Sequence, residues 1–315
     1  MKKTSYLLIN LAYLFLLWSC INQRDKTYKI SETYRLSSSK GTTSFLSVEL
    51  PISYGYQSVS DIKIENADEY FFEQKDSYQT LNAVIKGDGI EKMITITYSI
   101  TLLKGKYTWN TINKNEYLLP TEFIDCDNQS IIDIASTLKV ENEVNKTAQN
   151  ISKYVTKNIK FDHTVKINQK TFKASEVLKN KKGVCQDYAN LMTALLRASG
   201  IPAKNISGLV FNRLKSSSDW SSPAISHGWV EFYMNGKWYF ADPTWGNRYF
   251  TQSDGYHLSY GTQNLVNSNE NKSKINEIKN NGFTVIGGMT GPIFFTACSN
   301  DENARIIPKV DIIKQ

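Results

Sequence analysis

A cysteine follows a glycine and opens an apolar helical pattern in the stretch Gly183-Val184-Cys185-Gln186-Asp187-Tyr188-Ala189. The apolar side chains continue at helical spacing through Leu191, Met192, Leu195 and Leu196. Gly200 and Pro202 end the pattern, because glycine suits a helix end and proline cannot continue a helix. The sequence therefore predicts a helix that begins near Cys185 and stops before Gly200.

The position of Cys185 suits thiol chemistry. The thiolate is the nucleophilic form of cysteine, and the unpaired N–H groups and dipole at a helix N-terminus favour its negative charge. Gly183 would let the backbone approach a substrate closely. Taken alone, Cys185 fits a buried structural cysteine better than a nucleophile. Its interpretation therefore depends on what the fold brings beside it.

A β-hairpin is predicted downstream of this helix. Asn235-Gly236 lies between two alternating runs and favours a two-residue type I′ turn. Such a turn pairs Met234 with Lys237 and sets the register of two strands, at His227–Tyr233 and Lys237–Ala241.

This register places Trp229 opposite Asp242, and His227 lies two residues before Trp229 on the same sheet face. His227 and Asp242 are then diagonal neighbours on adjacent strands. Their backbone positions are about 7–8 Å apart, which is within reach of the side chains. A carboxylate at that place fixes the tautomer of the imidazole, whose other nitrogen can face a thiol. The sequence therefore predicts a catalytic set with Cys185 as nucleophile, His227 as base and Asp242 as the orienting residue.

Other residues near these motifs are weaker candidates. His163 and His257 do not lie on a predicted strand beside a paired acid, so neither is preferred as the base. Trp229, Trp245 and Gln186 are candidate substrate contacts. Core packing is the alternative for the two tryptophans, and hydrogen bonding at the helix start is the alternative for Gln186.

The first residues predict a targeting segment. Lys2 and Lys3 precede a short apolar run, which is followed by Leu17-Trp18-Ser19-Cys20. This pattern resembles a bacterial lipoprotein signal, which implies removal of residues 1–19 and lipidation of the Cys20 thiol. We therefore expect a membrane-anchored protein of the cell envelope, since two or more acyl chains hold a protein stably at a membrane. An uncleaved membrane anchor is the alternative.

Cysteine usage indicates a free thiol. If Cys20 is acylated, three cysteines remain, Cys126, Cys185 and Cys298, and an odd number in an exported protein leaves at least one unpaired. A disulfide between Cys126 and Cys298 has no support from spacing. The sequence holds no CxxC, HExxH or calcium-loop pattern, so neither a metal site nor a cofactor is predicted.

Composition indicates a globular protein that does not bind nucleic acid. Of its 315 residues, 41% are hydrophobic and 21% are charged. The net charge of +7 comes from lysines scattered along the chain rather than from a basic run.

The texture of the chain divides it into segments. Residues 28–115 read as short alternating strands and predict a small β-sandwich-like domain, a scaffold or a binding module. Residues 118–250 carry the motifs above and predict the catalytic core. Within it, helices are expected at 131–138, 144–159 and 175–180, and a strand at 205–212. Residues 20–27 are expected to form a tether, and residues 251–315 a C-terminal extension that packs on the core.

Four ordered motifs together resemble the transglutaminase-like superfamily: Gly183–Ala189, Arg197–Ala203, His227–Glu231 and Asp242–Trp245. The resemblance covers roughly residues 118–250. It implies an α+β, papain-like fold in which the nucleophile helix packs on an antiparallel sheet. It also implies that Cys185 is the nucleophile, His227 the base and acid, and Asp242 the orienting residue. Gly228 stands where alanine is common in that superfamily.

The resemblance further implies that a thiolate attacks an amide and forms a thioester, whose acyl group passes to water or to an amine. The motifs do not encode that choice. For a lipid-anchored bacterial protein we expect hydrolysis of peptide or protein amides, with acyl transfer as the alternative. A non-catalytic module that binds peptides or proteins is a further alternative. Calcium activation is not expected, because no calcium-loop pattern is present.

Overall fold

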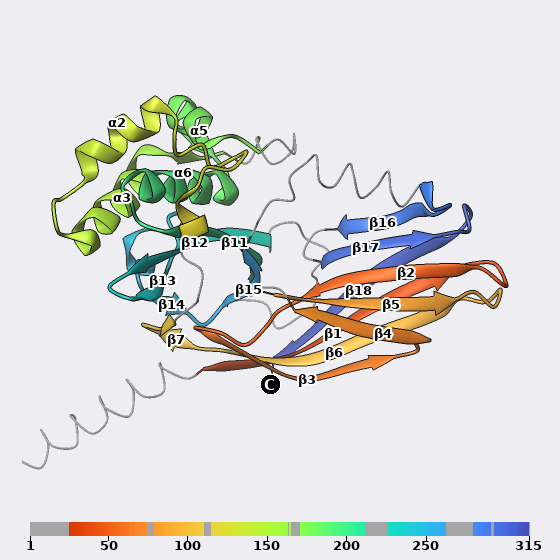
Figure 1. Cartoon of the computed structure of the whole chain (residues 1–315). Coiled ribbons are helices and arrows are strands. Elements are labelled where there is room, and N and C mark those ends of the chain that lie inside the picture. Colours follow the sequence, from red (N-terminus) through yellow and green to blue (C-terminus); the bar gives the residue numbers. More distant parts are fainter. Residues whose placement is uncertain are drawn as a thin grey trace, which may run out of the picture.

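The computed structural model describes residues 25–74, 78–109, 115–162, 164, 171–211, 226–262, 280–290 and 293–314. The fold is α+β. Helices pack over a core sheet at one end, and a β-sandwich forms the other end (Figure 1). The expected signal segment, Cys20 and His163 lie outside the described residues. Within the described ranges, no helix is long and apolar enough to cross a membrane.

The sandwich consists of two antiparallel sheets. The strands of the first, in spatial order, are β18 (Arg305–Lys314), β1 (Lys26–Ser37), β6 (Lys92–Leu102) and β3 (Gln57–Glu65). Those of the second are β16 (Thr284–Thr290), β17 (Ile293–Ser299), β2 (Thr43–Leu50), β5 (Gln79–Lys86) and β4 (Glu69–Gln74). Burial alternates along β1, β2, β5 and β6, because every second side chain is apolar and faces the opposing sheet of the sandwich.

The end of the chain completes this sandwich, which differs from the expected extension on the core. β18 pairs with β1 over ten residues, and β17 pairs with β2 (Figure 1, blue beside red and orange). Among the described residues of the expected extension, only β15 (His257–Thr262) joins the core sheet. The physical reason is that β1 and β2 need partners on both edges, and an antiparallel strand from the far end of the chain satisfies their backbone groups.

The helical layer matches the sequence expectation closely. It contains α2 (Gln129–Leu138), α3 (Val144–Asn158), α5 (Ala174–Asn180) and α6 (Cys185–Ala198). α6 is surrounded by the others and contributes eleven buried residues, so it is the central helix of this layer. Short elements link the layers: β7 (Lys104–Gly105), β8 (Thr108–Trp109), η1 (Asn115–Leu118), β9 (Lys160–Phe161), β10 (Lys182–Gly183), η3 (Asn247–Tyr249) and β14 (Ser253–Asp254).

The core sheet has the strand order β15, β11 (Ala203–Val210), β12 (Ser226–Met234), β13 (Lys237–Ala241) and β8. The expected hairpin is present, with Met234 paired to Lys237. Both turn residues, Asn235 and Gly236, have positive φ, at 50° and 84°, as a type I′ turn requires. The register of β12 and β13 therefore follows the prediction from the turn.

The sandwich and the core sheet share a buried polar network. The hydroxyls of Tyr54 and Tyr56 donate to Oε1 of Glu231, at 2.9 and 3.0 Å. The indole N–H of Trp229 donates to the Tyr56 hydroxyl at 2.9 Å. Burial raises the pKa of Glu231 above its ordinary value, although the two tyrosines oppose that shift. The turn before β3 is thus built into the core, so the sandwich is not a detachable module.

A fragment of residues 115–262, which keeps the helices and most of the core sheet, should therefore fail to fold alone. It loses the tyrosines that satisfy Glu231 and Trp229, and leaving each such buried group unsatisfied costs about 1–3 kcal/mol. Circular dichroism during thermal unfolding should show no cooperative transition for the fragment, while residues 25–315 unfold in one. A sharp transition in the fragment would show that the core is independent.

Gly208 on β11 lets β15 approach the core. A Cβ at this position would lie 2.0 Å from the carbonyl oxygen of Leu258 and 2.5 Å from the ring of Trp229. The pairing of β11 with β15 shifts register between Ile206 and Gly208. Glycine is needed here because two backbones and a large ring meet at one point.

Gly208→Ala should lower the free energy of unfolding by about 1–3 kcal/mol, since neither a backbone carbonyl nor a packed indole can move aside cheaply. Gly228→Ala is the matched control on the neighbouring strand. Its Cβ would meet the movable Oε1 of Gln186 at 2.9 Å, so we expect a smaller loss. Equal denaturation midpoints for the two variants would contradict this account of Gly208.

Candidate active site

The start of α6 is held by a buried carboxylate. Oδ2 of Asp187 accepts the N–H of Val184 at 2.8 Å, and Oδ1 accepts the N–H of Phe172 at 3.2 Å. A Cβ on Gly183 would lie 2.5 Å from the Cβ of Asp187. Gly183 is therefore required for this packing, a reason that the sequence did not indicate. The result is a rigid helix start with Cys185 as its first residue.

Cys185 is half-buried and faces β12. Burial alone would raise the pKa of its thiol, but the charge of His227, a hydrogen bond with that ring and another from the Gly228 N–H outweigh it. The pKa of Cys185 is therefore lowered below its ordinary value. This is the condition under which a thiol is ionised at neutral pH and can act as a nucleophile.

His227 and Asp242 meet across the hairpin. Nε2 of His227 lies 2.8 Å from Oδ2 of Asp242, and the N–H of Thr244 donates to Oδ1 at 2.8 Å. The side chains of His227 and Asp242 are 8% and 0% exposed. Because Nε2 is engaged by Asp242, Nδ1 is the nitrogen that remains for the thiol.

Charges decide the protonation of this pair. Burial would lower the pKa of His227, but the charges of Asp242 and Cys185 outweigh it and raise this pKa to about 10. Burial would likewise raise the pKa of Asp242, but His227 lowers it well below the ordinary value. The arrangement therefore favours a thiolate, an imidazolium and a carboxylate in contact, and it can deliver a proton as the thiolate attacks.

The candidate substrate contacts take different places. Trp245 is 39% exposed and stacks on the His227 ring, with centroids 4.7 Å apart and planes at 18°. Trp229 is fully buried beneath the same ring and packs in the core. Gln186 packs against Gly228 and donates to Asn190 at 3.1 Å. Of the three, Trp245 is the exposed wall beside the reacting atoms.

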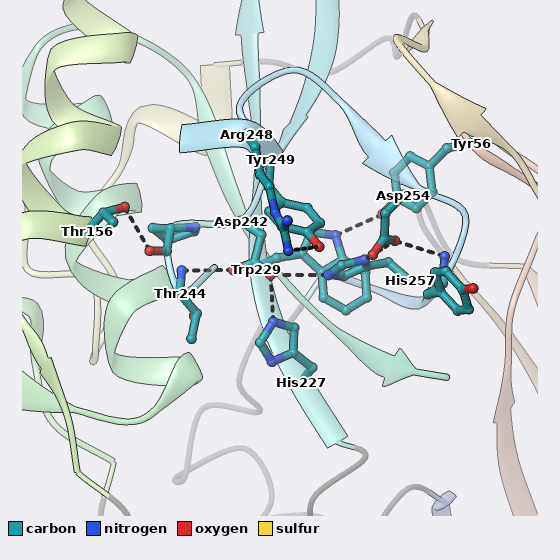
Figure 2. A network of polar contacts seen from close by, with 12 residues as sticks. Tyr56, Thr156, His227, Trp229, Asp242, Thr244, Arg248, Tyr249, Asp254 and His257 are labelled. Atoms are coloured by element: carbon teal, nitrogen blue, oxygen red, sulfur yellow. Dashed lines mark hydrogen bonds and ion pairs between the residues drawn. The ribbon is translucent and has the colours of Figure 1, made fainter. Parts of the chain in front are cut away.

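His257 also contacts the orienting carboxylate, which the sequence did not indicate. Its Nε2 lies 3.2 Å from Oδ2 of Asp242, and its Nδ1 lies 2.9 Å from Oδ1 of Asp254. Figure 2 shows Asp242 between His227 and His257, with Asp254 beyond. No local spacing links His257 to Asp242, because β15 reaches the site by pairing with β11 rather than with the hairpin.

The two histidines and Asp242 form a cluster of possible metal ligands. His227, Asp242 and His257 each offer one ligand atom, and these atoms lie within 4.8 Å of one another. Hydrogen bonds already join the same atoms, so this cluster is held together without a metal ion.

The three described cysteines are all free, so Cys126 and Cys298 form no disulfide. Burial raises the pKa of both thiols.

Comparison with known proteins supports the same reading of these residues. Residues 132–243 match the family model described as the transglutaminase-like superfamily. The chain contains a transglutaminase-like domain. This domain comprises the helical layer and the hairpin, so all three predicted catalytic residues lie within it.

Related proteins share parts of this chain. The kyphoscoliosis peptidase of Mus musculus is 26% identical over 80 residues, which is 25% of this chain and 12% of that protein. A protein of Methanocaldococcus jannaschii is 34% identical over 135 residues, covering 40% of this chain and 36% of that one. The chain thus spans well under half the length of these relatives.

One solved structure shares the overall fold. A candidate cysteine protease from Cytophaga hutchinsonii aligns over 93% of this chain and 98% of its own, with a TM-score of 0.54 and 15% identity. The alignment therefore includes the sandwich as well as the transglutaminase-like domain.

The transglutaminase-like domain should contain one early-ionising thiol. At about pH 6, iodoacetamide should alkylate Cys185 faster than it alkylates a free cysteine, because the lowered pKa of Cys185 gives it a larger thiolate fraction. The reactivity should change again near pH 10, where His227 loses its proton. Mass spectrometry of the labelled peptide gives the rates.

Two variants complete this experiment. Cys185→Ala measures the background from the other cysteines. Asp242→Asn removes the charge that raises the pKa of His227, so the fast alkylation of Cys185 at about pH 6 should disappear. Fast alkylation at about pH 6 that persists in Asp242→Asn would contradict the role of this carboxylate in keeping His227 charged.

Proposed function

We propose that this protein is a thiol-dependent hydrolase of peptide or protein amides that works through Cys185, His227 and Asp242. The single observation that carries the proposal is the place of His227. Its ring contacts the Cys185 thiol, and its Nε2 lies 2.8 Å from Asp242. The nucleophile thus contacts its base, and the base contacts its orienting residue, which is the arrangement that acyl transfer needs.

In the first half of the reaction, Sγ of Cys185 attacks the carbonyl carbon of an amide and forms a C–S bond. The C–N bond then breaks, and its electron pair leaves with the amine, which takes the proton from Nδ1 of His227. The N–H of Cys185 lies at the first position of α6 and has no partner within the helix. It is a suitable donor to the oxyanion that forms at the carbonyl.

In the second half, water attacks the thioester and gives a proton to Nδ1 of His227. The C–S bond breaks, the carboxylic acid leaves, and the thiolate and imidazolium form again. Asp242 keeps Nε2 protonated throughout, so that Nδ1 is the atom that takes and gives the proton.

Two comparisons favour hydrolysis over transfer to an amine. One matched relative carries the name of a peptidase, and one structure with the same fold is described as a candidate cysteine protease. The N-terminal pattern that ends at Cys20 supports a lipid anchor in the cell envelope. We therefore place the reaction at a membrane surface, on peptides or proteins that reach it.

A peptide library tests the reaction directly. Wild-type protein should release new amino termini or ammonia from the library, and Cys185→Ala should lower the rate at least about a thousandfold, because nucleophile and base act as a unit. His227→Gln should give a similar loss. A tagged primary amine added to the reaction distinguishes the two outcomes, since an acyl transferase would attach it to the peptides.

The control is Trp245→Phe, which keeps a ring over His227 and leaves the three reacting side chains in place. It should retain the reaction, with a change mainly in KM if the exposed ring contacts the substrate. Product formation by Cys185→Ala at the wild-type rate would overturn the proposal. Peptide binding without any turnover in wild-type protein would favour a binding module instead.

A further inference from the structure

We propose that His257 is a positioning residue, held as an imidazolium by Asp254, that fixes the Asp242 carboxylate and limits how tightly it holds the proton of His227. The inference rests on the proposed function, because it concerns the same reacting thiol. It adds a second histidine and a second carboxylate, so that five groups alternate in charge from Cys185 to Asp254.

The hydrogen bonds of Asp242 require a donor on His257. Oδ2 of Asp242 accepts from Nε2 of His227 at 2.8 Å and lies 3.2 Å from Nε2 of His257, while Oδ1 accepts the N–H of Thr244. The pKa of Asp242 is far below its ordinary value, so this group is a carboxylate with no proton to give. Nε2 of His257 must therefore carry the hydrogen of that contact.

The other nitrogen of His257 must also carry a hydrogen. Nδ1 lies 2.9 Å from Oδ1 of Asp254, and the same oxygen accepts the N–H of Tyr256 at 2.9 Å. An aspartate is ordinarily ionised at neutral pH, so this oxygen accepts both hydrogens. With both nitrogens donating to carboxylate oxygens, His257 carries a positive charge in the interior.

Aromatic side chains enclose the ring of His257. Its side chain is fully buried, and four aromatic rings surround it, with centroids 5.0–6.1 Å from its own. These rings belong to Trp229, Phe240, Trp245 and Tyr249. A side chain locked in this way can hold Asp242 at a fixed position, which is what a base needs from its orienting residue.

The charged and titratable groups around His257 come from several elements. They are His227 on β12, Asp242 after β13, Tyr249 and Arg248 in η3, Asp254 in β14, Tyr256 before β15 and Lys26 at the start of β1. Lys26 donates to the carbonyl of Asp254 at 3.4 Å, and Arg248 donates to the Tyr249 hydroxyl. Among these groups, His257 contacts the carboxylates of both Asp242 and Asp254 through its two ring nitrogens.

The charge of His257 acts on His227 through Asp242. The two imidazole rings are 5.6 Å apart at their centroids, and both contact the same carboxylate oxygen. A second cation there weakens the attraction between Asp242 and His227, so His227 gives up its proton to a leaving amine more readily. The same positive charge favours the Cys185 thiolate.

His257→Gln tests the charge with little change in shape, because glutamine can keep one N–H donor to Asp242. Loss of a nearby positive charge raises the pKa of both Cys185 and His227. The whole pH profile of Cys185 alkylation should therefore move upward by about one pH unit. For hydrolysis, kcat should fall while KM stays unchanged, because His227 becomes a weaker acid and the substrate contacts remain the same.

Ser259→Ala is the matched control. Ser259 is buried on the same strand, two residues from His257, but it hydrogen-bonds to Tyr54 and Gln57 rather than to Asp242. This variant should lose some stability and keep the wild-type alkylation profile. An upward shift of equal size in Ser259→Ala and His257→Gln would mean that packing, not charge, sets the profile, and the inference would fail.

Nitrogen-15 NMR of histidine-labelled wild-type protein tests the inference without a variant. At neutral pH the buried His257 ring should show two protonated nitrogens, and a neutral tautomer there would overturn it. If wild-type protein shows no early thiolate at all, the proposed function fails. If it does, and His257→Gln leaves the profile in place, the role of His257 alone is wrong.

Discussion

The active site depends on one hydrogen bond, between Nε2 of His227 and Oδ2 of Asp242, which is 2.8 Å long and almost closed to solvent. It forms because a two-residue turn at Asn235-Gly236 sets the register of β12 and β13. The bond leaves Nδ1 for the thiol of Cys185 and keeps the imidazole charged. Without it, burial would lower the pKa of His227 and raise that of Cys185, and no ion pair would form.

The rest of the molecule holds these two strands in place. α6 brings the thiol to the end of β12, fixed at its start by Asp187. The sandwich supports the opposite side, where Tyr56 accepts from Trp229 beneath the His227 ring. β15 closes the site with His257, and it can do so because Gly208 presents no side chain. The transglutaminase-like domain is therefore stabilised by segments outside residues 132–243.

Local patterns predicted the parts of the site that are close in sequence. A helix start at Cys185 follows from apolar spacing and the ending at Gly200, and the hairpin follows from period-two alternation around a tight turn. His257 was not predicted, because its contact with Asp242 depends on strand pairing with β11 and on a register shift there. The pairing of β18 with β1 joins opposite ends of the chain and has no local signal either. Gly183 was predicted to allow a close approach of a substrate, and its close approach to Asp187 was not predicted.

The most direct test of the central claim is the ultraviolet absorbance of the Cys185 thiolate as a function of pH, taken as the difference between wild-type protein and Cys185→Ser. This absorbance should be present well below the ordinary pKa of a thiol, about 8.5, and it should be lost from that range in His227→Gln. A thiolate that forms only at or above the ordinary value in wild-type protein would contradict the ion pair, and with it the reaction proposed for this site.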